Sequence, residues 1–401
     1  MSCCRICGAP LNNSNQVISF REIPFKTCLV STAEEALSVE RGDIELFWCG
    51  QCGLIQQREA LPLEKLYNDA NYIGNWRFQP HMSEQLDFLK KHTQFTSCLE
   101  IGSGNGQFLK ALKEQTGIKK ALGLEANQNT VSAALADGIF TIHGIMNEEK
   151  ALEIKKEWGY FDVIVARHVL EHMPDLKSFF HFADILLDDQ GCIFAEVPNF
   201  TPLHTHTEYA YTFASHEHVT LFTAPTLALM FQIYGYGRQH LYSDYRGGGV
   251  LNILASKGVR AASLSHSLYQ KPPSRPSLAA ITQFSDELRR LAEEAAGMGQ
   301  SIALYGAGSH GLMLLHMCPL FDLVDVVLDD IPGKHGLFLP GCDRSIIPVK
   351  SVKDHPADTF VVLALHPEWE EAAIERLSNH RSGPMTIVPV LSRRAKIYLK
   401  S

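Results

Sequence analysis

Between residues 80 and 257, short apolar runs alternate with segments in which apolar residues recur at helical spacing. The runs predict strands, and the segments between them predict helices. The predicted strands are Cys98–Ile101, Lys120–Glu125, Phe140–His143, Phe161–Ala166 and Cys192–Val197. Such a β-α alternation predicts a parallel, doubly wound α/β sheet.

Two more strands, Gln239–Tyr245 and Val250–Ser256, form an apparent hairpin through Arg246–Gly249. A polar, Pro/Ser-rich stretch then reads as a linker, and a helix is predicted over Leu278–Met298. The alternation returns in the strands Ile302–Tyr305, Val324–Leu328, Phe360–Leu365 and Thr386–Val390. We therefore expect four parts: a cysteine module at 1–66, a central domain at 67–257, a linker and connecting helix at 258–300, and a Rossmann-like domain at 301–401.

The first central strand runs into a glycine-rich loop, Gly102-Ser103-Gly104-Asn105-Gly106, and a helix follows. Glycines let the backbone approach a ligand closely, and the start of the helix points unpaired N–H groups at it. Glu100 precedes the loop, and Glu125 ends the next strand. An acid at the end of the second strand accepts hydrogen bonds from the ribose of an adenosine cofactor. These residues alone do not separate NAD from S-adenosylmethionine.

The N-terminal segment carries two CxxC pairs, Cys4 with Cys7 and Cys49 with Cys52. Two such turns complete a tetrahedral four-sulfur zinc site, while Cys3 has a looser spacing to Cys7. A closed four-sulfur site has no open position, so we expect structural zinc. The alternative is a set of buried or free thiols.

Composition places the chain among ordinary globular proteins, with 401 residues, 45% hydrophobic and 20% charged. A net charge of −8 argues against nucleic acid or an anionic membrane as the main partner. No apolar run approaches the roughly 20 residues of a membrane span, and no signal-peptide core is seen, so we expect a cytoplasmic enzyme. The ten cysteines then favour metal ligands or thiols over disulfides.

Candidate acid–base residues follow the fourth and fifth central strands. Arg167 and His168 end the fourth strand over the expected cofactor cleft, and His172 follows on the next loop. A later segment holds a cluster of imidazoles and carboxylates: His204, His206, Glu208, His216, Glu217 and His218. That segment is open to three interpretations: a second metal site, general acid–base chemistry, or a polar loop. Upstream, Tyr72 lies in an aromatic stretch that is either a linker or a lid.

A second glycine loop, Gly306–Gly311, follows the first strand of the last domain. Its GxGxxG pattern, with Asp329 and Asp330 some way on, matches a dinucleotide fingerprint. NAD or substrate can bind such a loop, or the loop can merely pack.

The pattern E-x-G-x-G-x-G without a P-loop lysine resembles class I S-adenosylmethionine-dependent methyltransferases, and VARHVLEHMPD and GCIFAEVPN resemble later strand ends of that fold. The whole order of parts resembles the nucleotide-sugar C-methyltransferase family. The stretches that carry this resemblance are CRICG with CGQCGLIQ, EIGSGNGQFL, SHEHVTLFT, RGGGV, and YGAGSHG followed by VVLDDIPGKHGLFLPG. His310 stands where the family often has lysine, and CDRSIIP departs from the usual segment, which leaves the sugar and its nucleotide open.

The resemblance implies methyl transfer from S-adenosylmethionine to carbon of a keto-deoxysugar carried by a nucleoside diphosphate, through an enolate. His218 matches the base, and Glu217 either orients it or contacts the substrate. Tyr72 and His172 match groups that stabilise or protonate the enolate oxygen. The implied cofactor-binding residues are Glu100, Gly102, Ser103, Gly104, Gly106, Glu125, Ala126, Arg167 and His168. Two alternatives stay open: an O- or N-methyltransferase of another small metabolite, and a non-catalytic nucleotide-binding protein.

Overall fold

The structure is a computed structural model of the chain. It describes residues 2–61, 78, 80–201, 215–243, 249–258, 274–354, 359–365, 367–380 and 385–390. The chain divides into two compact units. The first unit comprises Met1–Gln16, Leu46–Thr201 and Glu217–Arg275, and the second comprises Val17–Glu45, Pro202–His216 and Pro276–Ser401.

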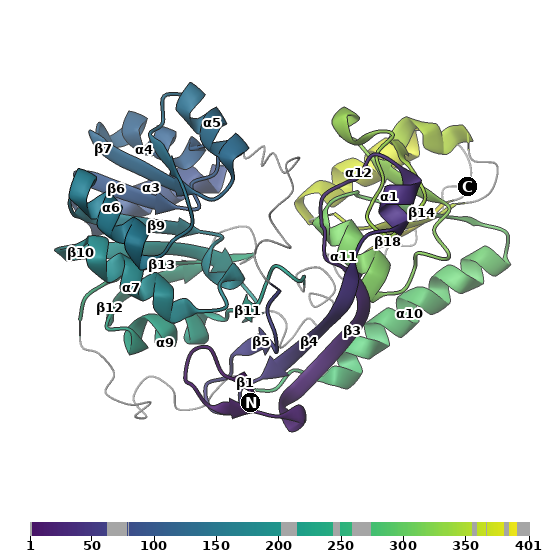
Figure 1. Ribbon diagram of the computed structural model, residues 1–401. Coiled ribbons are helices and arrows are strands. Elements are labelled where there is room, and N and C mark those ends of the chain that lie inside the picture. The colour runs from purple at the N-terminus through teal and green to yellow at the C-terminus, as the bar shows by residue number, and fades with distance from the viewer. Residues whose placement is uncertain are drawn as a thin grey trace. The chain divides into compact units, whose positions relative to one another are not determined.

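The first unit is built on a seven-stranded sheet (Figure 1). In spatial order its strands are β12 (Arg238–Ser243), β13 (Val250–Ser256), β10 (Leu187–Pro198), β9 (Phe161–Arg167), β6 (Ser97–Ile101), β7 (Lys120–Glu125) and β8 (Thr141–His143). The five strands from β10 to β8 are parallel, as predicted. β13 runs antiparallel to both β10 and β12, so the predicted hairpin adds an antiparallel edge.

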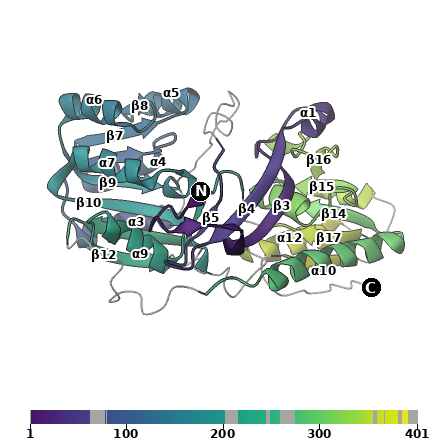
Figure 2. The ribbon, with the colours of Figure 1, turned by 60° about the horizontal axis from the view of Figure 1, so that its bottom comes forward.

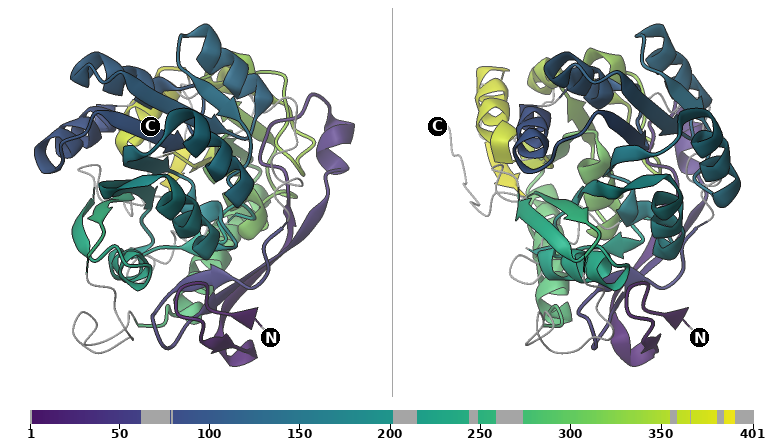
Figure 3. Two further views of the ribbon diagram at one scale, coloured as in Figure 1. Left: turned by 60° about the vertical axis from the view of Figure 1, so that its left-hand side comes forward. Right: turned by 90° about the vertical axis from the view of Figure 1, so that its left-hand side faces the viewer.

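Helices cover both faces of this sheet (Figures 2 and 3). One core joins Cys98, Val163 and Val165 to apolar side chains of α3 (Pro80–His92), α4 (Gln107–Thr116) and α5 (Gln128–Ala136). The other joins the alternate strand residues Leu99 and Ile164 to α6 (Glu148–Trp158), α7 (Leu176–Leu186) and α9 (Ala224–Ile233). Burial on both faces explains why these strands read as continuous apolar runs.

The N-terminal segment adds short strands and turns. They are β1 (Ser2–Cys3), β2 (Pro10–Leu11), η1 (Asn13–Asn15), β3 (Gln16–Pro24), α1 (Ala33–Leu37), β4 (Arg41–Trp48) and β5 (Ile55–Gln57). β3, β4 and β5 belong to a four-stranded sheet that is completed by β11 (Thr220–Leu221). Along the chain, β4 leads from the second unit into the first.

The second unit has a five-stranded sheet that is parallel throughout, as predicted for a Rossmann-like domain. Its strands, in spatial order, are β16 (Ile346–Pro348), β15 (Val326–Asp329), β14 (Ser301–Tyr305), β17 (Thr359–Leu363) and β18 (Met385–Pro389). Its helices are α10 (Leu278–Gly297), α11 (Ser309–Met317) and α12 (Pro367–His380), with short turns η5 (Pro332–Lys334) and η6 (Val349–Asp354). None of the helices in the described part of the chain has the length and apolar content needed to cross a membrane.

Candidate active site and zinc centre

Four cysteine sulfurs meet in the first unit, as their spacing predicted. Sγ of Cys4 lies 3.5 Å from Sγ of Cys52, and Sγ of Cys7 lies 3.5 Å from Sγ of Cys49. All four sulfurs lie within 4.8 Å of one another. Thiolates bound at about 2.3 Å to a tetrahedral zinc ion lie roughly 3.8 Å apart, so this donor set fits Zn²⁺.

Each CxxC pair is held by the same turn. The N–H of Gly8 donates to the carbonyl of Cys4 at 2.9 Å, and the N–H of Gly53 donates to that of Cys49 at 2.8 Å. Both glycines have positive φ, 73° and 80°, which favours glycine at these positions. The neighbouring thiols, that of Cys4 foremost, and burial raise the pKa of Cys52. Four thiolates within 4.8 Å of one another repel unless a cation lies between them, and a closed four-sulfur site makes that cation structural.

The first glycine loop has the open backbone that a close ligand requires. Gly102, Gly104 and Gly106 all have positive φ, at 67°, 54° and 77°. A Cβ on Gly102 would lie 2.7 Å from Cγ2 of Val169, so a side chain there is excluded. Ser103 is buried between these glycines, and the N-terminus of α4 follows directly. The N–H groups of Gly102, Ser103, Gly104 and Gly106 are all bonded within the protein, so what the loop offers a ligand is close approach to its backbone at the carboxyl edge of the sheet.

Glu125 holds this loop in shape. Its Oε2 accepts a hydrogen bond from the N–H of Gly104 at 2.9 Å, and its Oε1 accepts one from the N–H of Asn127 at 2.9 Å. A carboxylate oxygen has two lone pairs, so each oxygen can also accept from a ribose hydroxyl. Ala126 is exposed beside it, and its carbonyl lies 3.0 Å from Nε2 of His143.

A charged network lies beneath the ends of β6, β9 and β10. The fully buried Glu196 accepts from Nε of Arg167 at 2.8 Å, and Nε2 of His81 lies 3.1 Å from its other oxygen. Nε of Arg167 also lies 3.1 Å from Oε1 of Gln85, and its Nη1 lies 3.8 Å from Oε1 of Glu100. Burial opposes ionisation of Glu196, but Arg167 outweighs it and holds the pKa of Glu196 well below its usual range. Arg167 therefore points into this network.

Glu100 is a buried acid that lies just before the glycine loop, with one carboxylate oxygen 3.8 Å from Nη1 of Arg167. Burial raises its pKa to about 8, although Arg167 acts in the opposite direction. Within the described residues its buried Oε2 has no hydrogen-bond partner. An orphaned carboxyl oxygen beside the glycine cradle fits the positive charge of S-adenosylmethionine better than the neutral adenosine end of a dinucleotide.

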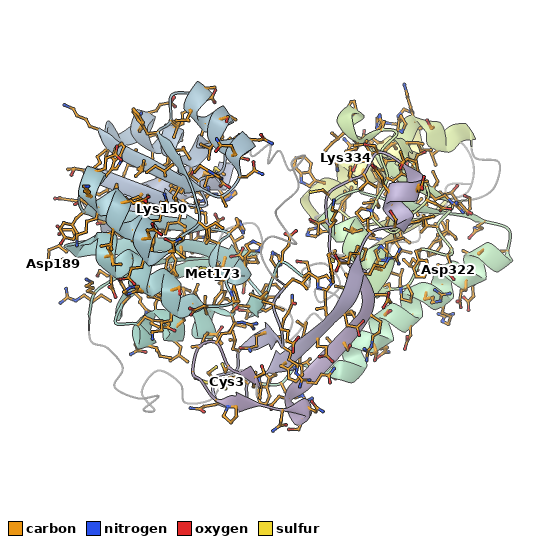
Figure 4. All side chains as sticks on the ribbon, in the orientation of Figure 1. Cys3, Lys150, Met173, Asp189, Asp322 and Lys334 are labelled. Atoms are coloured by element: carbon orange, nitrogen blue, oxygen red, sulfur yellow. The ribbon has the colours of Figure 1, made fainter. Side chains whose placement is uncertain are left out.

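Three imidazoles gather around one carboxylate where β9 passes into the turn η2 (Leu170–His172). Nδ1 of His168 lies 3.1 Å from Oε1 of Glu171, and Nε2 of His172 lies 3.7 Å from the same oxygen. Nδ1 of His172 donates to the carbonyl of Glu217 at 2.9 Å. The rings of His172 and His218 have their centroids 5.1 Å apart. Met173, labelled in Figure 4, follows this turn directly.

The structure therefore brings together three of the residues that the sequence singled out for acid–base chemistry: His172, Glu217 and His218. His216 does not join them; it is buried in the second unit, where its Nε2 donates to the carbonyl of Ile23 at 3.1 Å. The expected role of Tyr72 falls outside the described residues, as do His204, His206 and Glu208.

Sequence reasoning missed the buried carboxylates Glu171 and Glu196, as well as His81 beside Glu196 and Gln85 beside Arg167. Glu196 did leave a signal, because a charge inside the apolar run GCIFAEVPN needs a buried partner. Glu171 left none, since it sits in a 3₁₀ turn with no apolar period around it.

The second glycine loop is clamped by an acid in the same way as the first. Oδ2 of Asp329 accepts from the N–H of Ala307 and Oδ1 from the N–H of Ile331, both at 2.9 Å. Unlike Glu125, Asp329 also pairs with Nζ of Lys334 at 2.8 Å. The acid is thus already neutralised by a lysine, which weakens the case for NAD ribose binding.

A cavity of about 480 Å³ opens beside this loop, within the second unit. Lys334, labelled in Figure 4, and Arg376 line it together with His310 and Trp369. Arg376 lies 3.0 Å from Asp330, and within the described residues its buried Nε has no hydrogen-bond partner. The cavity is thus lined by cationic side chains, a helix N-terminus and an aromatic ring.

Family models match three consecutive parts of the chain. A model described as "Putative zinc binding domain" matches residues 4–67, a methyltransferase domain matches residues 75–240, and a C-methyltransferase C-terminal domain matches residues 273–390. No curated protein matches the sequence.

Solved structures resemble the chain only in part. An O-methyltransferase family protein from Burkholderia thailandensis is 12% identical, with a TM-score of 0.36 over 45% of this chain and 57% of its own. A SAM-dependent methyltransferase from Thermotoga maritima, described as a possible histamine N-methyltransferase, is 17% identical, with a TM-score of 0.35 over 44% and 89%. A SAM-dependent methyltransferase from Archaeoglobus fulgidus is 16% identical, with a TM-score of 0.34 over 44% and 94%. TM-scores this low support no argument about the chain.

The cysteine site, the glycine cradle and the second Rossmann-like unit coincide with the three matched domains in their order. The chain has the domain architecture of the C-methyltransferase family and is an S-adenosylmethionine-dependent methyltransferase with a structural zinc site.

Proposed function

We propose that this enzyme transfers a methyl group to a carbon atom next to the ketone of a nucleotide-linked keto-deoxysugar. The observation that carries the proposal is the pair of half-buried imidazoles of His172 and His218, whose ring centroids lie 5.1 Å apart. Val169, between His168 and the turn η2, reaches the loop at Gly102. The proton-transfer groups and the cofactor loop therefore lie at the same edge of the sheet.

S-adenosylmethionine supplies an electrophilic methyl group, so the protein's part is to create a carbon nucleophile and hold it in line. His218 takes the proton next to the ketone, and the resulting enolate oxygen is stabilised by His172, with Tyr72 as the second donor implied by the family resemblance. The carbonyl of Glu217 fixes the ring of His172, since it occupies Nδ1 and turns Nε2 toward the cluster. Methylation at carbon needs such a base, because a ketone's α-carbon carries no lone pair of its own.

In this proposal Glu125 and the glycine loop hold the ribose and methionine parts of the cofactor, with Glu100 opposite its positive charge. Asn127 and Gly104 occupy only one lone pair of each Glu125 oxygen, which leaves acceptors for the ribose hydroxyls. His168 directly follows β9, and its Nδ1 lies 3.1 Å from Oε1 of Glu171.

The second unit, taken by itself, has a cavity whose residues suit a nucleotide. Lys334 and Arg376 each have more N–H donors than their one acidic partner uses, and the N-terminus of α11 opens into the same cavity. This chemistry suits a diphosphate, and Trp369 offers a face on which a base can stack.

The test is to incubate the enzyme with S-adenosylmethionine and a panel of nucleotide-linked 4-keto-6-deoxysugars and to record mass spectra. A sugar heavier by one CH₂, formed together with S-adenosylhomocysteine, is the expected result. If calorimetry shows that the cofactor binds but no member of the panel is methylated, the proposed acceptor class is wrong.

A further inference from the structure

Glu171 is one of the two fully buried carboxylates beside the histidines; the other is Glu196. The exposed fraction of Glu171 is 0%. Among the described residues, its Oε2 has no hydrogen-bond partner, so half of the carboxylate is held only by nearby charge. Burying a carboxylate in this way is costly unless the carboxylate is paired. The cost therefore indicates that the buried carboxylate has a role toward the groups around it.

Those groups are imidazoles from three different places in the chain. His168 directly follows β9, His172 ends the turn η2, and His218 lies two residues before β11. Oε1 of Glu171 contacts Nδ1 of His168 at 3.1 Å and lies 3.7 Å from Nε2 of His172. The ligand-type atoms of Glu171, His172 and His218 all lie within 4.8 Å of one another.

The backbone of Glu171 reinforces this arrangement. Its carbonyl accepts a hydrogen bond from the N–H of Val219 at 2.8 Å, one residue beyond His218. The carbonyl of His218 in turn accepts from Nε2 of Gln57 at 2.9 Å. Side chain and main chain of the same residue therefore tie the turn η2 to the segment that carries His218.

His168 is held in an unusual conformation by the same contacts. Its φ is 52°, in the left-handed region that non-glycine residues rarely adopt. Its N–H donates to the carbonyl of Glu196 at 2.9 Å, and its ring lies between the carboxylates of Glu171 and Glu196. Positive φ at a residue locked by two carboxylates is typical of a functional site.

We propose that Glu171 is the positioning residue of the active site: a buried anion that orients His168, His172 and His218 without touching substrate or cofactor. It fixes which ring nitrogens face the reacting atoms and keeps positive charge favourable in the cluster. The inference rests on the proposed function, because it assigns the oriented imidazoles to proton transfer.

The charge balance around Glu171 supports this role. Burial alone would raise its pKa, but His172, then His168 and His218, outweigh burial and hold it below the usual range. Burial likewise opposes protonation of His168, whereas Glu196 and Glu171 raise its pKa above the usual value and Arg167 lowers it. The carboxylate and its histidines therefore stabilise one another's charged forms.

The decisive variant is Glu171→Gln, which keeps the size of the side chain and removes its charge. We expect kcat to fall about 10- to 100-fold, by analogy with the range for groups that orient metal-bound histidines, with KM for S-adenosylmethionine unchanged. In ¹³C-histidine NMR spectra the pKa of His168 should fall, because one of its two anions is lost. Glu171→Asp, which keeps the charge, should restore much of that pKa.

Asp184→Asn is the matched control. Asp184 lies on α7 in the same unit, accepts from the hydroxyl of Tyr236 at 2.8 Å and is not part of the histidine cluster. It should alter thermal stability while leaving kcat and the His168 titration as they are. The NMR titration needs no acceptor, so it tests the role of Glu171 even if the proposed sugar substrate is wrong.

An unchanged His168 titration in Glu171→Gln would overturn the inference, as would full kcat. A third result would also overturn it: metal analysis that finds, besides zinc, a second divalent ion in the wild-type chain that is absent from Glu171→Gln. Glu171, His172 and His218 would then be ligands to an ion, and Glu171 would bind it directly.

Discussion

Nδ1 of His172 lies 2.9 Å from the carbonyl oxygen of Glu217, so the ring donates to the main chain of the residue next to His218. The main-chain oxygen of Glu217 thus orients an imidazole. This hydrogen bond links the turn η2 to Glu217 and His218, the pair that the sequence singled out. The bond couples the positions of the two imidazoles and places the proposed base beside the proposed enolate stabiliser.

The first prediction concerns His218. Replacing it by Asn should lower turnover by roughly 10²-fold or more, the contribution of a positioned base, and should leave S-adenosylmethionine affinity unchanged by calorimetry. His181→Asn removes a more exposed imidazole on α7 and serves as the control. Near-full turnover by the His218→Asn enzyme would remove His218 from the role of base.

Glu125 carries the second prediction. Glu125→Ala should weaken S-adenosylmethionine binding by about 1–3 kcal/mol, the usual cost of lost charged hydrogen bonds, because both the ribose acceptors and the clamp on Gly104 disappear. Glu153→Ala, which removes an exposed carboxylate of α6, should bind normally in the same titration. Equal affinities for the two variants would show that Glu125 is not the ribose ligand.

The third prediction is a pH dependence that arises from Glu100. With a pKa of about 8, this carboxyl is protonated at neutral pH in the free enzyme. A cationic cofactor favours its ionised form, so binding should release a proton and affinity should rise as pH increases toward 8, then level off.

Calorimetry in buffers of different ionisation enthalpy measures that proton directly. Glu100→Gln, which cannot ionise, should bind without buffer-dependent heat. Heats that are the same in every buffer for the wild-type enzyme would contradict the assignment.

The fourth prediction concerns zinc. The wild-type chain should hold one zinc ion, and Cys49→Ser should lose it together with several kcal/mol of unfolding free energy, because binding of structural zinc is coupled to folding. Cys3→Ser is a control at an adjacent thiol outside the cluster, since Cys3 is exposed. Loss of zinc from Cys3→Ser, with retention in Cys49→Ser, would mean that the ligand set is wrong.

The features that the sequence predicted are local ones. The CxxC spacing, the two glycine loops and strands such as Lys120–Glu125 and Val250–Ser256 depend on residues close together in the chain. The preferences that define turns and buried strands depend on residues close together in the chain, so they predict these elements directly.

The features that it did not predict depend on distant contacts. Val30 pairs with Phe338 in the second unit, and nothing in either local sequence indicates that bridge. The role of Glu171 depends on the fold, which brings His218 beside it from 47 positions further along the chain. Burial of a carboxylate is a property of the folded packing. A single Glu next to a His belongs to no periodic pattern or motif that would predict its burial.

The central claim is methyl transfer to carbon, and one measurement tests it most directly. The enzyme is given [methyl-¹³C]S-adenosylmethionine and the keto-deoxysugar panel, and the product is examined by NMR. The account predicts a ¹³C methyl signal with one-bond coupling to a sugar carbon next to the ketone. A labelled methyl group attached to oxygen or nitrogen would contradict it.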